Sequence, residues 1–345
     1  MRIYIGIIFL ALTYGCNSGE TQIIIRETLP FEADLTVSKV VPLDDNSELF
    51  RPFRIRNLND DYVVVSELLP ENIFKVFKLP GMNFQYKWGK LGQGPNEFRG
   101  IPGDIMTSGD DLIIYDPVLK KLRTFEVKDS SVTHKKDMLL SYKNQLDPLN
   151  RIQRMNDTLY FVDYGTSIEK SNTEHVALKP DEEDTLFTFG EYPDSELKEA
   201  ERYFKFLKTN MSKPDGSLFA AFYLYQNKIK IYNTSGEIVK HIDLIDDHFS
   251  SSEETNNIIY REASWSSDDF IYTLGLNSSS EALYENPDST LKTFIEIFDW
   301  NGNQLFRAEF DRLINGFTVS EKYSKIYAYS ILEPQKLFVY ELPKI

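Results

Sequence analysis

The chain has few of the residues that build disulfides, metal centres or nucleophilic sites. Its 345 residues contain one cysteine and four histidines. A single cysteine excludes a disulfide within the chain, so a packed core has to stabilise the fold. No two histidines have metal-ligand spacing and no G-x-S-x-G motif occurs, so we expect neither a metal site, nor a cofactor, nor an assignable catalytic set. The histidines are His134, His175, His241 and His248.

Positive charge is also scarce. Lys and Arg number 38 against 53 Asp and Glu, which gives a formal net charge of −15. Nucleic acids and anionic lipid surfaces would repel such a protein, so neither is expected as its main partner.

Long hydrophobic runs are missing as well. Ile3 to Leu12 is apolar but has ten residues, too few to span a bilayer and enough for the core of a signal peptide behind Arg2. Gly15 and the lone Cys16 follow, and this ending resembles a bacterial lipobox, in which the chain is cleaved before the cysteine and a lipid is attached to its sulfur. Thr13 and Tyr14 depart from the usual Leu and small residue, a relaxed form found among Bacteroidota lipoproteins.

Three segments follow from this resemblance. We expect a lipoprotein signal peptide over 1–15, a lipid attachment site and tether over 16–34, and a folded domain over 35–345. The protein would sit in the cell envelope, lipid-anchored to a bacterial membrane. The outer membrane is favoured, on its periplasmic or outer side. The alternative is an ordinary secretory signal followed by a chance cysteine.

Aromatic residues are abundant, and they recur in a pattern. They make up 14% of the chain, which favours β-strands. Six times an Asp-rich or polar turn leads into a short apolar strand, as in Asp110 to Tyr115. The first apolar residues of these strands stand at positions 62, 112, 159, 218, 270 and 326, so the repeat is roughly fifty residues long.

This repeat predicts an all-β fold, a six-bladed β-propeller with four antiparallel strands per blade. Further alternating strands follow most of the repeats, and Gly81, Gly236 and Gly302 mark turns into fourth strands. The last unit has room for only three strands, so Leu35 to Leu43 is expected to supply its outer strand and close the ring. Helical spacing predicts one helix over Asp194 to Lys208.

A glycine-rich segment carries a family resemblance. Residues 92–98 read GQGPNEF, followed by Pro102, an Asp-rich turn and a strand ending in Tyr115-Asp116. The run over 88–126 resembles an NHL repeat, and more narrowly the TolB-like six-bladed propeller lipoproteins of Bacteroidota. The resemblance implies the fold and the envelope location, and no generally established activity comes with it.

We expect the residues of this motif to have structural roles. Gly92 and Gly94 would allow backbone conformations closed to other residues, and Pro95 would stiffen the crossing between two blades. Glu97 would accept hydrogen bonds from loop amides, and Phe98 would fill the gap between blades. The alternative is an anion-binding nest at Gly92 to Gly94.

Candidate ligand-binding residues follow from the repeat itself. Positions eight residues before each strand start should lie on or beside the innermost strands, near the propeller axis. Arg54 and Arg151 fall at this offset, and Arg261 lies next to it. Three arginines there would bind an anion, whereas the alternative is that they pair with acidic residues between blades.

The sequence therefore favours a propeller that binds a ligand or partner without covalent chemistry. The expected ligand is an anionic small molecule or saccharide, and an envelope protein is the other possible partner. Two alternatives stay open: a hydrolase or lyase acting on a saccharide or lactone, and a scaffold subunit of an envelope complex. The acidic runs near Asp181 and Asp243 lack calcium-loop geometry and are interpreted as solvated turns.

Overall fold

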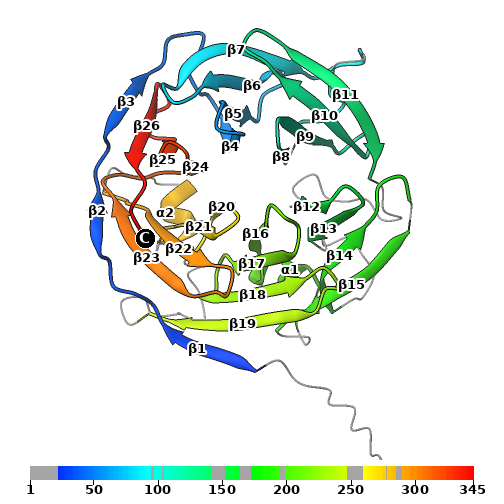
Figure 1. Cartoon of the computed structure of the whole chain (residues 1–345), viewed down its shortest axis with the longest axis vertical. Helices are drawn as coiled ribbons and strands as arrows, with labels where there is room; N and C mark the ends of the chain where they lie inside the picture. Colours follow the sequence, from blue (N-terminus) through cyan, green and yellow to red (C-terminus); the bar gives the residue numbers. More distant parts are fainter. Residues whose placement is uncertain are drawn as a thin grey trace, which may run out of the picture.

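The computed structural model shows a closed ring of six β-sheets around a central axis (Figure 1). It describes residues 22–94, 97–102, 105–140, 152–163, 172–182, 184–193, 197, 199–246, 259–276, 278–284 and 290–345. Cys16, Pro95 and Arg151 lie outside these residues.

Each sheet is one blade, and its strands follow one another from the axis outwards. Blade 1 contains β4 (Pro52–Leu58), β5 (Tyr62–Glu67), β6 (Glu71–Lys78) and β7 (Asn83–Lys90). Blade 2 contains β8 (Ile105–Ser108), β9 (Asp111–Asp116), β10 (Lys121–Val127) and β11 (Val132–Leu139). Blade 3 contains β12 (Ile152–Asn156), β13 (Leu159–Asp163), β14 (Thr173–Leu178) and β15 (Thr185–Glu191).

The second half repeats the arrangement. Blade 4 contains β16 (Lys208–Ser212), β17 (Leu218–Tyr223), β18 (Lys228–Asn233) and β19 (Ile238–Ile245). Blade 5 contains β20 (Ala263–Ser266), β21 (Phe270–Gly275), β22 (Phe294–Asp299) and β23 (Gln304–Phe310). Blade 6 contains β24 (Gly316–Ser320), β25 (Lys325–Tyr329) and β26 (Lys336–Glu341). The prediction of six antiparallel blades is confirmed.

The core lies between the blades. The two middle strands of a blade are buried on both faces, and every residue of β5 is buried. Val64 and Phe74 of blade 1 belong to one cluster with Leu112 and Phe125 of blade 2. Since each sheet packs on its two neighbours, the ring is held by apolar contacts and needs no disulfide.

The N-terminal segment closes the ring, as predicted. Strand β3 (Lys39–Pro42) pairs antiparallel with β26 and becomes the fourth strand of blade 6. Phe338 lies opposite Val40, and Leu337 lies opposite Val41. The first and last strands of the propeller domain thus share one sheet, which removes the open edge of β26.

The segment expected to be a tether is partly built into the propeller. Strand β1 (Ile23–Glu27) pairs in parallel with β19, and β2 (Ala33–Leu35) pairs in parallel with β23. Residues 22–42 therefore form a strap that adds an outer strand to blades 4, 5 and 6 in turn (Figure 1). Contact with the propeller begins at Ile23, twelve residues earlier than the expected start at Leu35, because the outer edges of β19 and β23 are available for pairing.

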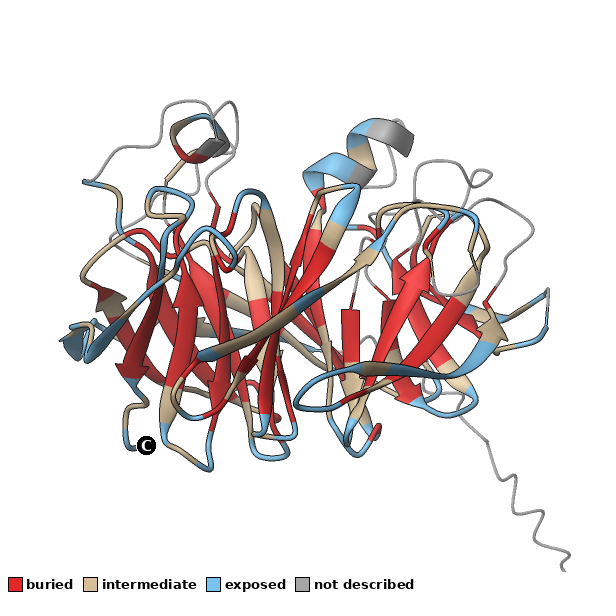
Figure 2. Ribbon diagram, turned by 90° about the horizontal axis from the view of Figure 1, so that it is seen from above, coloured by how far each residue is buried: buried red, intermediate tan, exposed pale blue. Residues whose placement is uncertain are grey.

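Among the described residues, two short helices lie on one face of the ring (Figure 2). Helix α1 (Glu199–Lys205) precedes β16, and α2 (Ser280–Tyr284) follows β21. The predicted helix over 194–208 is therefore shorter than expected, because its last residue already belongs to the innermost strand of blade 4. Both helices lie on the face where the innermost strands begin.

Candidate functional site

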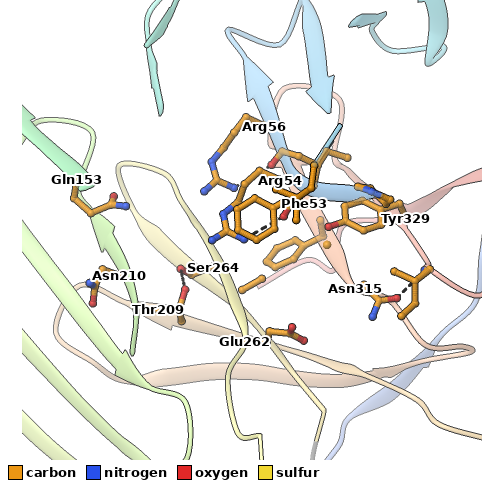
Figure 3. Close-up of a pocket in the computed structure, with 17 residues that line it drawn as sticks. Phe53, Arg54, Arg56, Gln153, Thr209, Asn210, Glu262, Ser264, Asn315 and Tyr329 are labelled. Carbon is orange, nitrogen blue, oxygen red and sulfur yellow. Dashed lines mark hydrogen bonds between the residues drawn. The ribbon is translucent and has the colours of Figure 1, made fainter. Parts of the chain in front are cut away.

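A cavity of about 340 Å³ lies on the propeller axis, at the face where the innermost strands begin. Residues of β4, β12, β16, β20 and β24, or residues directly beside these strands, line it. Figure 3 shows their side chains converging on one space, although their positions span more than 270 residues of sequence. The cavity therefore exists only because the ring is closed.

The cavity has one apolar side and one polar side (Figure 3). The apolar side comes from blades 1 and 6 and includes Phe53, Phe317 and Tyr329. A Cβ at Gly316 would overlap the Tyr329 ring, so a glycine at this position is what lets the ring pack here. The polar side comes from blades 3, 4 and 5. Its lining residues are Gln153, Thr209, Asn210, Glu262 and Ser264.

Two arginines of one strand stand between these sides. Arg54 and Arg56 are two residues apart on β4, so both side chains leave the same face of the strand. The Arg54 guanidinium carbon lies 3.9 Å from the centre of the Phe53 ring, and its Nη1 donates to the Phe53 carbonyl over 3.1 Å. Arg56 Nε donates to the carbonyl of Ile105 in blade 2 over 3.2 Å. These contacts fix both guanidinium groups in place.

The charges of the cavity act on a buried phenol. Burial raises the pKa of Tyr329 far above its ordinary value, and the Glu262 carboxylate raises it further. The positive charges of Arg54 and Arg56 lower the same pKa. Tyr329 is therefore neutral at physiological pH, and two cations and one carboxylate lie within electrostatic reach of its ring.

The polar side is fixed by hydrogen bonds behind the cavity. Thr209 and Ser264 join blades 4 and 5 through a hydroxyl–hydroxyl bond of 2.8 Å. Asn210 Nδ2 donates to Asp163 Oδ1 over 2.5 Å, and this carboxylate also lies 3.0 Å from His175 Nδ1. Asp163 and His175 do not line the cavity. They act on it by holding the Asn210 amide in one orientation.

The structure separates the three predicted arginines. Arg54 lines the cavity, as expected. Arg261 does not line it: its side chain is 1% exposed, lies 2.7 Å from Glu296 Oε2 and donates to Asn227 Oδ1. The alternative, a buried ion pair, holds for Arg261, so this residue leaves the ligand-binding set. Arg151 lies outside the described residues.

The neighbour of Arg261 takes the expected position. Glu262, at the eight-residue offset, lines the cavity together with Asn210 at the same offset in blade 4. Sequence reasoning missed Arg56, Gln153 and Tyr329. Arg56 could have been predicted from the sequence, since residues two positions apart on a strand lie on the same side and Arg54 was already a candidate. No local signal marks Tyr329, which belongs to a second strand.

The glycine-rich motif lies between blades 1 and 2, and its glycines differ from the expectation in one respect. Glu97 Oε2 accepts a hydrogen bond from the Gly94 amide over 2.7 Å, and Phe98 is fully buried between blades 1 and 2. Lys90 bonds to the Glu97 carboxylate and lowers its pKa. Gly92 and Gly94 do not adopt positive φ angles. They are required because a Cβ at either position would crowd the Glu97 carboxylate.

A second cavity, of about 510 Å³, lies at the other end of the innermost strands. Arg56 and Gln153 line both cavities, so the two adjoin along the axis. Four carboxylates line this end, against three cationic side chains, Arg56, Arg154 and Lys213. Arg154 also bonds to Asp157 outside the lining. The first cavity has two arginines and one carboxylate, so it suits an anion better than this end does.

Within the described part of the chain, no three His, Cys, Asp or Glu residues form a group that could hold a metal ion. The same residues include no helix long and apolar enough to cross a membrane.

Comparisons with known proteins agree with this architecture. A family model described as TolB-like 6-blade propeller-like matches residues 31–322. No curated protein matches the chain. A Bacteroides fragilis protein to which export has been ascribed has a solved structure with a TM-score of 0.53 and 13% identity, covering 93% of this chain and 99% of its own.

A second solved structure, of a DUF4221 family member from Bacteroides vulgatus, gives a TM-score of 0.50 at 10% identity. It covers 89% of this chain and 97% of its own. At such low sequence identities the two structures support the fold and nothing beyond it. The family model, in contrast, covers most of the chain and includes the axial residues from Arg54 to Thr318. This chain therefore belongs to the TolB-like six-bladed propeller-like family.

Proposed function

We propose that this protein is a lipid-anchored envelope protein whose propeller binds a small anionic molecule in the axial cavity. The observation that carries the proposal is the pair Arg54 and Arg56, whose guanidinium groups are held at a cavity of about 340 Å³. The excess of negative charge elsewhere on the chain makes this local concentration of positive charge distinctive.

Guanidinium groups at the wall of a cavity suit carboxylate, sulfate or phosphate. Their planar forks form paired hydrogen bonds with such groups. Contacts in a partly enclosed site also exceed the ~0–1 kcal/mol of a surface ion pair, because less water screens them. The amides and hydroxyls of the polar side would bond to hydroxyl groups of the same ligand. Acidic saccharides and carboxylated envelope components are therefore the first class to screen.

Calorimetric titration of the soluble chain beginning at Asn17 tests this binding. Acidic sugars such as glucuronate and galacturonate should bind, and Arg54→Ala should reduce their affinity at least tenfold. Arg54→Lys keeps the charge without the planar fork and should restore part of the loss. Arg51→Ala is the matched control, because Arg51 is exposed and does not line the cavity. Equal affinities of Arg54→Ala and wild type for every anion bound would refute the proposal.

The lipid anchor rests on the sequence. The ten-residue apolar run ends at Gly15-Cys16, and Cys16 is the only cysteine. Export ascribed to the structurally similar Bacteroides fragilis protein supports an envelope location. Cys16→Ala should move the full-length protein from the membrane fraction to the soluble fraction. Continued need for detergent to extract the variant would contradict lipidation at this residue.

A further inference from the structure

The apolar side of the axial cavity does not end at the cavity. Ile331, in the loop after β25, lines the cavity and is still 37% exposed. Its neighbour Leu332 is 38% exposed, and Phe50, before β4, is 62% exposed. These three side chains stand on the face at which the cavity lies, since their loops join the strand ends that line it.

Hydrogen bonds hold these loops against each other. The Leu49 amide donates to the Pro334 carbonyl over 3.0 Å, and the Leu68 amide donates to the Arg51 carbonyl over 2.9 Å. The Ile331 amide donates to Asn315 Oδ1, inside the cavity lining, over 2.8 Å. Phe50 and Leu332 thus lie on adjoining loops, beside the part of the cavity wall formed by Phe53, Leu68 and Ile331. We call these five residues, which lie on the cavity wall and on the loops beside it, the apolar strip.

A fully hydroxylated anion would use only part of this site. Its charge would meet Arg54 and Arg56, and its hydroxyl groups would meet the polar side. The apolar strip would remain in contact with water, which gains nothing from the hydrophobic effect. A ligand with an apolar part would cover the strip while its charge stays at the arginines.

We propose that the natural ligand is an anionic amphiphile, a molecule with one acidic polar head and one alkyl or aryl tail. This inference rests on the proposed function, because the head is the anion that Arg54 and Arg56 bind. The head lies between the arginines and the polar side, and the tail runs along Phe53 and Ile331 toward Leu332 and Phe50. The two arginines select the charge, and the strip selects the tail.

Three small probes separate the contribution of the charge to affinity from that of the tail: glucuronate, octyl glucuronide and octyl glucoside. They share a sugar ring and differ in charge or tail. All are titrated calorimetrically into the soluble chain, below the concentration at which the octyl compounds form micelles. Each methylene that is fully covered should raise affinity about fourfold. We therefore expect octyl glucuronide to bind at least tenfold more tightly than glucuronate, and octyl glucoside to bind much more weakly than octyl glucuronide.

Variants of the strip give the second arm. Phe50→Ser and Leu332→Ser change exposed loop residues that lie outside the cavity lining, so the fold should tolerate them. Each should lower the affinity for octyl glucuronide at least threefold and leave that for glucuronate unchanged. Val239→Ser is the matched control, because Val239 is an exposed apolar residue on β19, at the outer side of blade 4. It should change neither affinity.

The outcomes distinguish this inference from the proposed function. Equal affinities for glucuronate and octyl glucuronide, both reduced by Arg54→Ala, would refute the amphiphile and leave the anion site standing. Tail-dependent binding that Arg54→Ala does not reduce would refute both. Co-sedimentation with phosphatidylglycerol vesicles, lost in Leu332→Ser and without binding of monomeric octyl glucuronide, would overturn the inference in favour of a membrane-contacting face.

Discussion

Blades 4, 5 and 6 differ from blades 1, 2 and 3 in what covers their outer edges. The strap adds β1, β2 and β3 outside β19, β23 and β26, whereas β7, β11 and β15 are the outermost strands of their sheets. Blades 1 to 5 each have four strands without the strap, and blade 6 obtains its fourth strand from β3. The outer edges of half of the ring are therefore covered by a segment that precedes its partner strands by up to 300 residues in the sequence.

The uncovered edges carry other protection. Strand β11 has Lys135 and Lys136 beside His134 and Asp137, and β7 has Lys87 and Lys90. Charged side chains at a sheet edge oppose pairing with another chain. Strand β15 has only Glu191 at its end and exposes Leu186. Edge protection is thus supplied by the strap on one side of the molecule and by charge on most of the other.

The largest effect should come from removing the strap. A soluble chain that begins at Asp44 lacks β1, β2 and β3, and leaves the edge of β26 open. We expect it to aggregate or to fail to unfold cooperatively, while a chain that begins at Gln22 behaves as wild type. Size-exclusion chromatography and thermal unfolding compare the two. Identical melting temperatures would show that β3 does not close the ring.

An intermediate chain sharpens this test. A chain that begins at Leu29 loses only β1, whose Ile24 packs against the buried cluster that contains Ile231 and Ile242, and whose Arg26 donates to the Gly302 carbonyl. Partial burial of one isoleucine predicts a loss of about 1–3 kcal/mol in unfolding free energy. A loss as large as that of the chain beginning at Asp44 would place closure in β1 instead of β3.

Buried charges should give the next largest effect. In blade 5, Glu296 faces Arg261 and Arg307, and the strap covers Arg307 through Phe31, whose ring lies 4.3 Å from the guanidinium. In blade 1, Glu67 faces Lys75 alone, and no strap strand lies outside this blade. Removing one partner of a buried pair costs about 3–5 kcal/mol.

Glu296→Gln should therefore destabilise the protein by about 3–5 kcal/mol, and by more than Glu67→Gln, because Glu296 pairs with the buried Arg261 and also faces Arg307, whereas Glu67 pairs with one lysine. Urea unfolding of both variants at pH 7 measures the difference. A smaller loss for Glu296→Gln would mean that the strap and Asp246, 2.8 Å from Arg307, compensate in blade 5.

A pH effect should appear where an uncovered blade meets a covered one. His175 of blade 3 is fully buried near Lys208 of blade 4; burial lowers its pKa, and Asp163 opposes this change. An imidazole with a lower pKa in the folded protein takes up its proton preferentially in the unfolded chain. Acid below about pH 6.5 therefore reduces stability, by at most about 1.4 kcal/mol per pH unit.

His175→Phe should remove this part of the pH dependence, since Phe189 and Phe219 already surround the ring. Unfolding free energies at pH 7.5 and 5.5 should differ by about 1 kcal/mol less in the variant than in wild type. Glu174 does not interfere. Burial alone would raise the pKa of Glu174, but the charges of Lys208 and Lys230 lower it to about 2. The stability that the Glu174 carboxylate contributes is therefore lost only below about pH 4.5. His134→Gln, on the exposed β11, is the control, and an unchanged slope in His175→Phe would contradict the assignment.

The smallest expected effects concern the uncovered edges themselves. Lys136→Leu removes an edge charge from β11, and Leu186→Lys adds one to β15. Both should change the unfolding free energy by less than about 0.5 kcal/mol. Light scattering during refolding should nevertheless rise for Lys136→Leu and fall for Leu186→Lys. Equal scattering would show that these edges do not govern association.

The repeat, the number of blades and the closing strand could all be predicted from the amino-acid sequence. These features are local. An Asp-rich turn, a period of two along each strand and a missing fourth strand can be found without knowing which strands pack against each other. The hydrogen bond between Glu97 and the Gly94 amide could also be predicted from sequence, because the two residues lie three positions apart.

Which residues face the axis, and where the strap lies, depend on long-range packing of the blades. Neighbouring residues of a strand point to opposite faces, so Glu262 lines the cavity while Arg261 is buried against Glu296. A spacing argument with an error of one residue cannot choose between them. The sequence of β1 does not indicate its partner strand, because its parallel pairing with β19 joins positions more than 200 residues apart. Such contacts arise from ring closure, and no local pattern encodes them.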